Sequence, residues 1–228
     1  MQIHRPIPSQ HIRLLIFDLD GTLIDSRQDL ANSVNSALRS LGRKELPSDE
    51  IASMVGDGAP ALVRRALGDT VDEDLLRRGV ESFLSYYREH KLDHTHLYAG
   101  IPEALERLQG APPSRRVMSV LTNKPVNPSR AILNALGIGE RFVSVYGGNS
   151  FETKKPDPLG ISTILGETGV RPDQAVMIGD SAVDILTGRA AGTWTCGVTY
   201  GFAPHTLMET PGDIVVDTAS ELVDALRA

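Results

Sequence analysis

A short apolar run spans residues 12–17 and is interrupted only by Arg13. Such a run, bounded by polar residues, is typical of a strand that is buried on both faces of a parallel sheet. Further runs of this kind occur at residues 117–121, 142–146, 175–178, 193–198 and 214–216. Because they alternate with stretches of helical spacing, the pattern predicts an α/β protein with a doubly wound, Rossmann-like parallel sheet.

Helices are expected between these strands and after the last one. Asn127 followed by Pro128 is typical of a helix start, and Gly137 is typical of a helix end. Asp157 and Pro158 mark another start of the same kind. The helices expected in this part of the chain cover residues 102–108, 127–137, 157–169, 180–191 and the segment after 216.

Residues 26–91 show helical spacing without any strand pattern. Ser26 with Asp29 resembles a capping box, and Gly42 suits the position just after a helix end. Asp72 is placed to cap a second long helix. Shorter helices are expected between these two, at residues 48–54 and 59–67.

This pattern predicts two domains. An α/β domain would be formed by residues 1–23 and 99–228, and a small helical domain, residues 24–98, would be inserted into it. The proline-containing segment 110–114 is expected to be a surface loop.

Composition and charge narrow the class of protein. Of 228 residues, 41% are hydrophobic and 23% are charged, which is ordinary for a globular protein. The net charge of −6 and the absence of any Lys/Arg-rich run argue against a nucleic-acid partner. The sequence shows neither an apolar stretch long enough for a membrane span nor a signal-peptide pattern. The single cysteine, Cys196, excludes an internal disulfide and is expected to be buried, so a cytoplasmic protein is expected.

Two carboxylates, Asp18 and Asp20, directly follow the first strand. Side chains alternate along a strand, so both project to the same side, at the edge where open α/β sheets place their ligands. Crowding two carboxylates there is unfavourable unless a cation or a functional task compensates. Gly21 allows a tight turn, and Thr22 supplies a hydroxyl group.

Other chemically active residues follow later strands, and the fold would bring them to the same edge. They are Thr122 with Asn123, Lys155, and Asp180 with Asp184. Carboxylate oxygens suit a hard cation such as Mg²⁺, and too few His or Cys residues lie near for zinc. A negatively charged protein that acts on an anionic substrate needs such a local cation.

Asp18 and Asp20 are close enough to divide two tasks. One carboxylate can attack phosphorus and form an aspartyl phosphate. The other can protonate the leaving oxygen and later deprotonate water.

Four segments together resemble the motifs of the haloacid dehalogenase superfamily of phosphatases, in the order that the family has them. They are FDLDGTLIDS at 17–26, LTNK at 121–124, KPDP at 155–158 and GDSAVD at 179–184. The resemblance implies Asp18 as nucleophile, Asp20 as general acid/base with its backbone carbonyl on Mg²⁺, and Asp180 as a metal ligand. Asp184 would belong to the metal's surroundings or orient Lys155.

The resemblance also implies a phosphate site and a mobile cap. Thr122 and the backbone amide of Asn123 would bind phosphate oxygens, and Lys155 would neutralise the phosphoryl charge. The helical insert would be the cap, which closes over the substrate and excludes water.

Within the superfamily, segments 55–59, 62–67 and 147–150 are similar to the phosphoglycolate phosphatases. This implies 2-phosphoglycolate as the leading substrate and Arg65 as a residue that binds it. One departure is Asp57, where asparagine is expected; its charge would disfavour an anionic substrate unless Arg64 or Arg65 offsets it.

Other functions remain open at this point. The substrate could be a sugar phosphate, a nucleotide or pyrophosphate, and a phosphomutase or a non-catalytic phospho-ligand sensor would share these motifs. Asp20 argues against a dehalogenase. The partner is expected to be a small phosphorylated metabolite, with the chain a monomer or a homodimer.

Two alternative sites are disfavoured by their context. Residues 56–61 match a loose dinucleotide fingerprint, but a helix rather than a strand is expected before them. His90, His94 and His96 are irregularly spaced and are expected to be surface or hinge residues.

Overall fold

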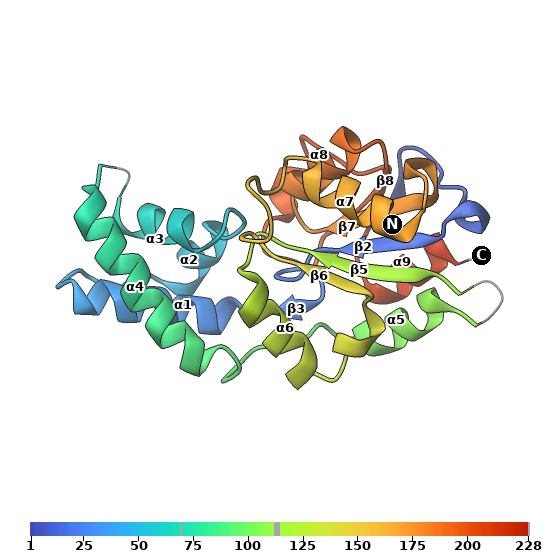
Figure 1. Cartoon of the computed structure of the whole chain (residues 1–228). Coiled ribbons are helices and arrows are strands. Elements are labelled where there is room, and N and C mark those ends of the chain that lie inside the picture. Colours follow the sequence, from blue (N-terminus) through green and yellow to red (C-terminus); the bar gives the residue numbers. More distant parts are fainter. Residues whose placement is uncertain (69, 112–114, 228) are drawn as a thin grey trace. The chain divides into compact units, whose positions relative to one another are not determined.

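The apolar run near the N-terminus forms a central strand, β2, of a seven-stranded sheet in the structure, a computed structural model that describes residues 1–68, 70–111 and 115–227 (Figure 1). Within these residues the strand order is β1-β9-β8-β7-β2-β5-β6. The strands are β1 Gln2–Ile3, β2 Leu14–Phe17, β5 Val117–Leu121, β6 Ser144–Tyr146, β7 Ala175–Gly179, β8 Trp194–Val198 and β9 Ile214–Val216. All pairs from β9 to β6 are parallel, which confirms the predicted sheet. The added edge strand β1 is antiparallel to β9, and its two residues are too few to leave a periodic pattern.

Helices cover both faces of this sheet. Figure 1 shows α7 and α8 on one face and α5, α6 and α9 on the other. Their bounds are α5 Ile101–Gln109, α6 Val126–Ala135, α7 Leu159–Thr168, α8 Ala182–Ala190 and α9 Ala219–Leu226, with short 3-10 helices at Ser9–His11, Gly139–Arg141, Pro172–Gln174 and Pro204–Leu207. On the α7 face, Leu14 and Ile16 of β2 share a buried cluster with Ile161 and Ile164. Cys196 in β8 is fully buried, as predicted.

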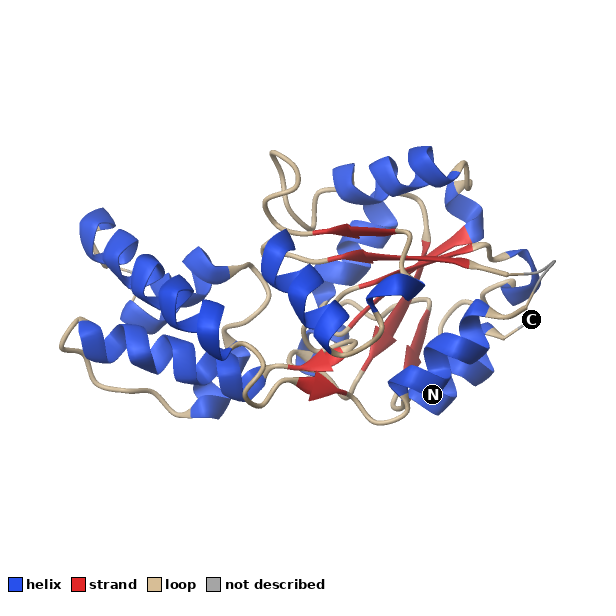
Figure 2. Cartoon of the chain, turned by 60° about the horizontal axis from the view of Figure 1, so that its bottom comes forward, coloured by secondary structure: helices blue, strands red, loops and turns tan. Residues whose placement is uncertain are grey.

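The chain divides into two compact units, Met1–Ile24 with Leu97–Ala228, and Asp25–His96. It passes between them through β3 (Ile24–Asp25) and β4 (His96–Leu97), which pair as a two-stranded sheet. In Figure 2 the strands of the large sheet belong to the first unit, whereas the second consists of helices and loops. The catalytic and cap roles assigned to these parts remain predictions.

The second unit is built from four helices within the described residues. They are α1 Arg27–Ser40, α2 Ser48–Ser53, α3 Ala59–Leu67 and α4 Glu73–His90. The Asp72 carboxylate accepts a hydrogen bond from the Leu75 N–H at 2.8 Å, so it caps α4 as predicted. No helix in the part of the chain that the structure describes is both long and apolar enough to cross a bilayer.

The predicted capping box of Ser26 with Asp29 is wrong. The Asp29 side chain is buried and accepts hydrogen bonds from the His94 and Thr95 N–H groups and from the Thr95 hydroxyl, at 2.7 to 3.1 Å. These donors lie more than sixty residues away in sequence, so a local pattern could not reveal them. Asp29 therefore joins the entry and the exit of the helical segment.

The predicted start of α6 at Asn127 is also wrong. The helix begins at Val126 after Pro125, because the Asn149 side chain accepts a hydrogen bond from the Val126 N–H at 2.9 Å. A residue from another loop thus replaces the local cap. Of the expected surface loop 110–114, residues 112–114 lie outside the described part of the chain.

Candidate active site

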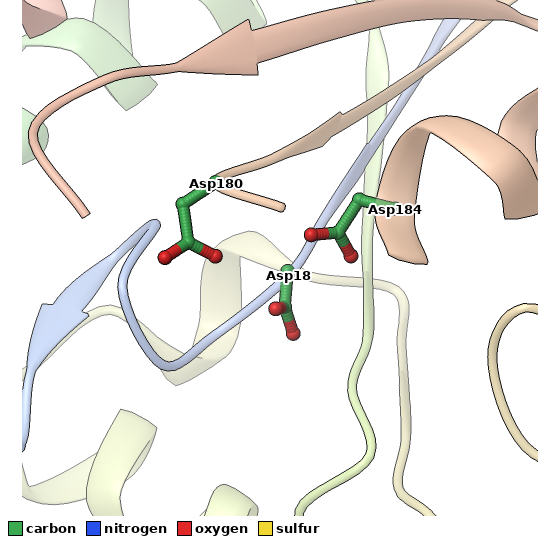
Figure 3. Close-up of side chains that lie close together, drawn as sticks. All are labelled: Asp18, Asp180 and Asp184. Carbon is green, nitrogen blue, oxygen red and sulfur yellow. The ribbon is translucent and has the colours of Figure 1, made fainter. Parts of the chain in front are cut away.

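Three carboxylates from two neighbouring strands and one helix meet at the end of the sheet. Asp18 follows β2, Asp180 follows β7, and Asp184 lies in the first turn of α8. Each contributes an oxygen, and these oxygens all lie within 4.8 Å of one another (Figure 3). All three residues are buried. The parallel register of β2 and β7 brings residues of similar position to the same edge.

Lys155 neutralises part of this charge. Its Nζ lies 2.9 Å from Oδ1 of Asp18 and 2.6 Å from Oδ1 of Asp184. Burial alone would lower the pKa of the Lys155 ammonium, but the carboxylates of Asp18 and Asp184 raise it above its usual value. The lysine is therefore positively charged at neutral pH.

Asp184 connects Lys155 to the start of α8. Its second oxygen, Oδ2, accepts hydrogen bonds from the N–H and the hydroxyl of Ser181, at 3.2 and 2.7 Å. The Ser181 side chain in turn accepts a hydrogen bond from the Asp184 backbone N–H, so the two residues form a capping box. Asp184 thus holds Lys155 from a rigid helix end.

Asp180 is held by a loop that follows β8. Its Oδ2 accepts hydrogen bonds from the backbone N–H groups of Phe202 and Ala203, at 2.6 and 3.3 Å. Burial, with the nearby Asp184 and Asp18 carboxylates, raises the pKa of Asp180 to about 8. This loop could not be predicted from the sequence, because backbone donors carry no signal in residue type.

Asp18 has a mixed environment. Burial raises the pKa of Asp18 to about 6, although the Lys155 ammonium opposes the change. The Asp18 carboxyl therefore lies beside the Lys155 ammonium, and yet its ionised form remains unfavourable without a further cation.

This cluster fits a divalent metal ion. Three buried carboxylates face one ammonium, so a second positive charge would relieve their repulsion. Oxygen donors of this kind suit Mg²⁺. It is the only group of three or more acidic, His or Cys ligands found within the described ranges. Both oxygens of Asp184 already accept hydrogen bonds, Oδ1 from Lys155 and Oδ2 from Ser181.

Gly21 is required where the loop after β2 passes Asp180. Its φ of +84° lies in the left-handed region, and a Cβ there would lie 2.2 Å from Oδ2 of Asp180. Only glycine therefore brings this loop so near to the carboxylate cluster.

The Asp20 side chain lies in a separate ion pair. Lys124 Nζ donates to both carboxylate oxygens of Asp20, each at 2.9 Å. No role for Lys124 was expected from the sequence. The available signal was its position two residues after Thr122, at the end of the strand beside β2.

Thr122 and Asn123 follow β5 and are buried. The Thr122 hydroxyl accepts a hydrogen bond from the Lys124 N–H at 3.3 Å. The Asn123 side chain accepts from the Lys155 N–H at 3.0 Å and donates to the Lys155 carbonyl at 3.1 Å. Asn123 thus fixes the backbone of Lys155, a contact that the sequence did not predict.

Arg65, the expected substrate residue of the helical unit, is engaged within that unit. It forms an ion pair with Asp57 and donates to the Met54 carbonyl at 2.6 Å. The charge of Asp57 is thus offset by Arg65, while Arg64 pairs with Glu73. A contact between Arg65 and the substrate remains a prediction.

Comparison with known proteins shows extensive similarity. Residues 15–198 match the family described as haloacid dehalogenase-like hydrolase. A phosphoglycolate phosphatase of Chromobacterium violaceum is 36% identical over 222 residues, which are 96% of this chain and 98% of that protein. A phosphoglycolate phosphatase of Vibrio parahaemolyticus is 36% identical over 224 residues, 95% of this chain and 97% of that protein.

A solved structure shows the same fold. It is a predicted phosphoglycolate phosphatase from Haemophilus somnus, with a TM-score of 0.88 and 31% identity. The match covers 94% of this chain and 97% of that one. The similarity in sequence and structure therefore extends over both units.

Proposed function

The chain belongs to the haloacid dehalogenase-like hydrolases, and from this membership we propose that it hydrolyses a small phosphomonoester through an aspartyl-phosphate intermediate. The observation that carries the proposal is the buried cluster in which Lys155 contacts both Asp18 and Asp184. A carboxylate nucleophile and a second carboxylate, Asp20, then both follow β2, and the ammonium of Lys155 contacts the first of them. These are the groups that phosphoryl transfer to an aspartate requires.

The reaction would proceed in two balanced displacements. An oxygen of Asp18 bonds to phosphorus while the ester P–O bond breaks, and Asp20 gives its proton to the leaving oxygen. Water then attacks phosphorus, the bond to Asp18 breaks, and Asp20 takes the proton from water. Proton transfer of this kind contributes roughly 10²–10⁴-fold to the rate.

The remaining residues stabilise charge. Mg²⁺ held by Asp18, Asp180 and the Asp20 carbonyl would supply positive charge beside the phosphoryl group. Lys155 neutralises the same group from its position between Asp18 and Asp184. Thr122 and the backbone of Asn123 would bind phosphate oxygens.

We propose 2-phosphoglycolate as the substrate. The support is that the two relatives named above are phosphoglycolate phosphatases and that each is matched over nearly its whole length. Sugar phosphates, nucleotides and pyrophosphate are the competing substrates.

A substrate panel tests this proposal. With Mg²⁺ present, kcat/KM for 2-phosphoglycolate is expected to exceed that for a hexose phosphate, a nucleoside monophosphate and pyrophosphate by at least about 10-fold. Release of inorganic phosphate is the measurement. A higher value for another ester would overturn the substrate, and isomerisation or ligand binding without phosphate release would overturn the hydrolase.

Arg65→Ala is expected to raise KM for 2-phosphoglycolate by about 10-fold and leave kcat unchanged. The reason is that a charge-assisted hydrogen bond to the substrate carboxylate, worth roughly 1.5–3 kcal/mol, would be lost. KM for an aryl phosphate, which lacks the carboxylate, should change little. Arg64→Ala is the control, because it removes the neighbouring arginine of α3 together with its ion pair to Glu73. An equal rise for both substrates would contradict carboxylate recognition by Arg65.

A further inference from the structure

We infer that Lys124 is the positioning residue for Asp20: its ammonium fixes the carboxyl group that transfers protons to and from the ester and water oxygens. The inference deepens the proposed function and rests on it. Lys124 follows β5, and Asp20 follows the adjacent strand β2, so the sheet register sets the two residues side by side.

The contact restrains Asp20 strongly. Lys124 Nζ lies 2.9 Å from each carboxylate oxygen, and the two side chains are only 5% and 12% exposed. A donor that contacts both oxygens opposes rotation of the carboxylate about its terminal bond. Because water has little access, the attraction is screened less than that of a surface ion pair.

The backbone around Lys124 is itself held by the loop after β6. Gly148 N–H donates to the Lys124 carbonyl at 2.9 Å. A Cβ at Gly148 would lie 2.3 Å from the Asn123 carbonyl oxygen, so glycine is needed for this approach. Two residues after Lys124, the Val126 N–H donates a hydrogen bond to the Asn149 side chain. The segment 147–150, noted in the sequence only for a family resemblance, thus holds the backbone around Lys124.

The two buried lysines contact different carboxylates. Lys155 contacts Asp18 and Asp184, whereas Lys124 contacts Asp20. Asp18 and Asp20 are only two residues apart, so Lys155 or a metal ion would compete for Asp20. With Lys124 in place, the Asp20 side chain is held apart from the metal-binding carboxylates and is available for proton transfer.

This role has a specific kinetic signature. The leaving group of an alkyl phosphate is a strongly basic alkoxide, which needs a proton as the P–O bond breaks. The leaving group of p-nitrophenyl phosphate, p-nitrophenolate, is a stable anion. Misplacing Asp20 should therefore slow the first displacement selectively for alkyl phosphates, whereas hydrolysis of the common aspartyl phosphate should slow alike for both esters. A loss of folding or of phosphate binding would slow both kinds of ester alike.

The experiment compares Lys124→Met with the wild-type protein on 2-phosphoglycolate and on p-nitrophenyl phosphate, with Mg²⁺ present. In single-turnover measurements of leaving-group release, we expect the rate for 2-phosphoglycolate to fall by about 10²-fold or more and the rate for p-nitrophenyl phosphate by less than about 5-fold. Lys124→Arg, which keeps the charge, should recover part of the loss. Lys154→Met is the matched control, because Lys154 is an exposed lysine of the adjacent loop.

Equal losses of the single-turnover rate for both esters, or no loss for either, would overturn the inference. If Lys124→Met fails to unfold cooperatively, Lys124→Gln must show the same selective loss, and its absence there would also overturn it. In Asp20→Asn, adding Lys124→Met should cost no further activity, since the two residues act as one unit. If the wild-type protein itself hydrolyses neither ester, the proposed function fails, whereas equal losses in the variant refute only the role of Lys124.

Discussion

Asp18→Asn is expected to lower kcat by at least about 10⁴-fold, the size of loss that follows removal of a residue from a catalytic unit. An amide cannot form the acyl phosphate, so the first displacement is lost. The fold should be retained, because asparagine has nearly the same shape and Lys155 keeps its contact with Asp184. Steady-state phosphate release and a thermal unfolding curve measure the two effects.

The matched control is Asp173→Asn, an exposed aspartate that pairs with Arg171. Its kcat should stay within about twofold of wild type, as for most surface substitutions. A beryllofluoride complex of the wild-type protein is expected on the Asp18 carboxylate. Unchanged kcat in Asp18→Asn, or an adduct on another residue, would refute the nucleophile.

Removal of divalent metal by a chelator is expected to lower kcat by at least about 10³-fold, because the ion supplies several kcal/mol of charge stabilisation. Added Mg²⁺ should restore turnover. Removal should also make stability depend on pH, since burial raises the pKa of Asp180 to about 8 and that of Asp18 to about 6.

The direction of this dependence follows from the two pKa values. A carboxyl whose pKa is higher in the folded than in the unfolded chain favours folding while it is protonated. That stability is complete below the unfolded pKa of about 3.9 and is lost as pH rises through about 6 and 8. The melting temperature of the metal-free protein should therefore fall, by on the order of 5 °C, between about pH 5 and about pH 8.5. Mg²⁺ should reverse the fall, most strongly at the higher pH.

Asp180→Asn separates this effect from other titrations. An asparagine oxygen can still accept the hydrogen bonds from Phe202 and Ala203, but it carries no charge. In the metal-free state this variant should lose less stability than wild type as pH rises. Full turnover in the presence of the chelator, or an equal pH dependence in both proteins, would contradict the metal site.

Much of the fold could be predicted because it depends on local patterns. The apolar runs that form β5 and β9 have the bounds expected from the sequence, and Asp72 caps α4 through a neighbour three residues away. Asp18 and Asp180 could be expected at one edge, because parallel strands end together. The catalytic roles of these residues stay predictions.

Contacts between distant segments could not be predicted in the same way. Asp29 has the residue type of a capping group, but its donors come from His94 and Thr95. Lys124 has a long side chain with several possible carboxylate partners, and only the strand register selects Asp20. Where a contact depends on tertiary structure, residue type indicates a possible chemistry and not the partner.

The pairing of β3 with β4 places the two ends of the helical segment next to each other. The chain leaves the α/β unit and returns to it on two strands that are hydrogen-bonded neighbours, and Asp29 ties the same two ends together. An insert of another length or composition can be grafted between such adjoining ends with little disturbance of the scaffold. We therefore expect an exchange of residues 25–96 to change the proposed substrate preference more than the proposed phosphoryl transfer.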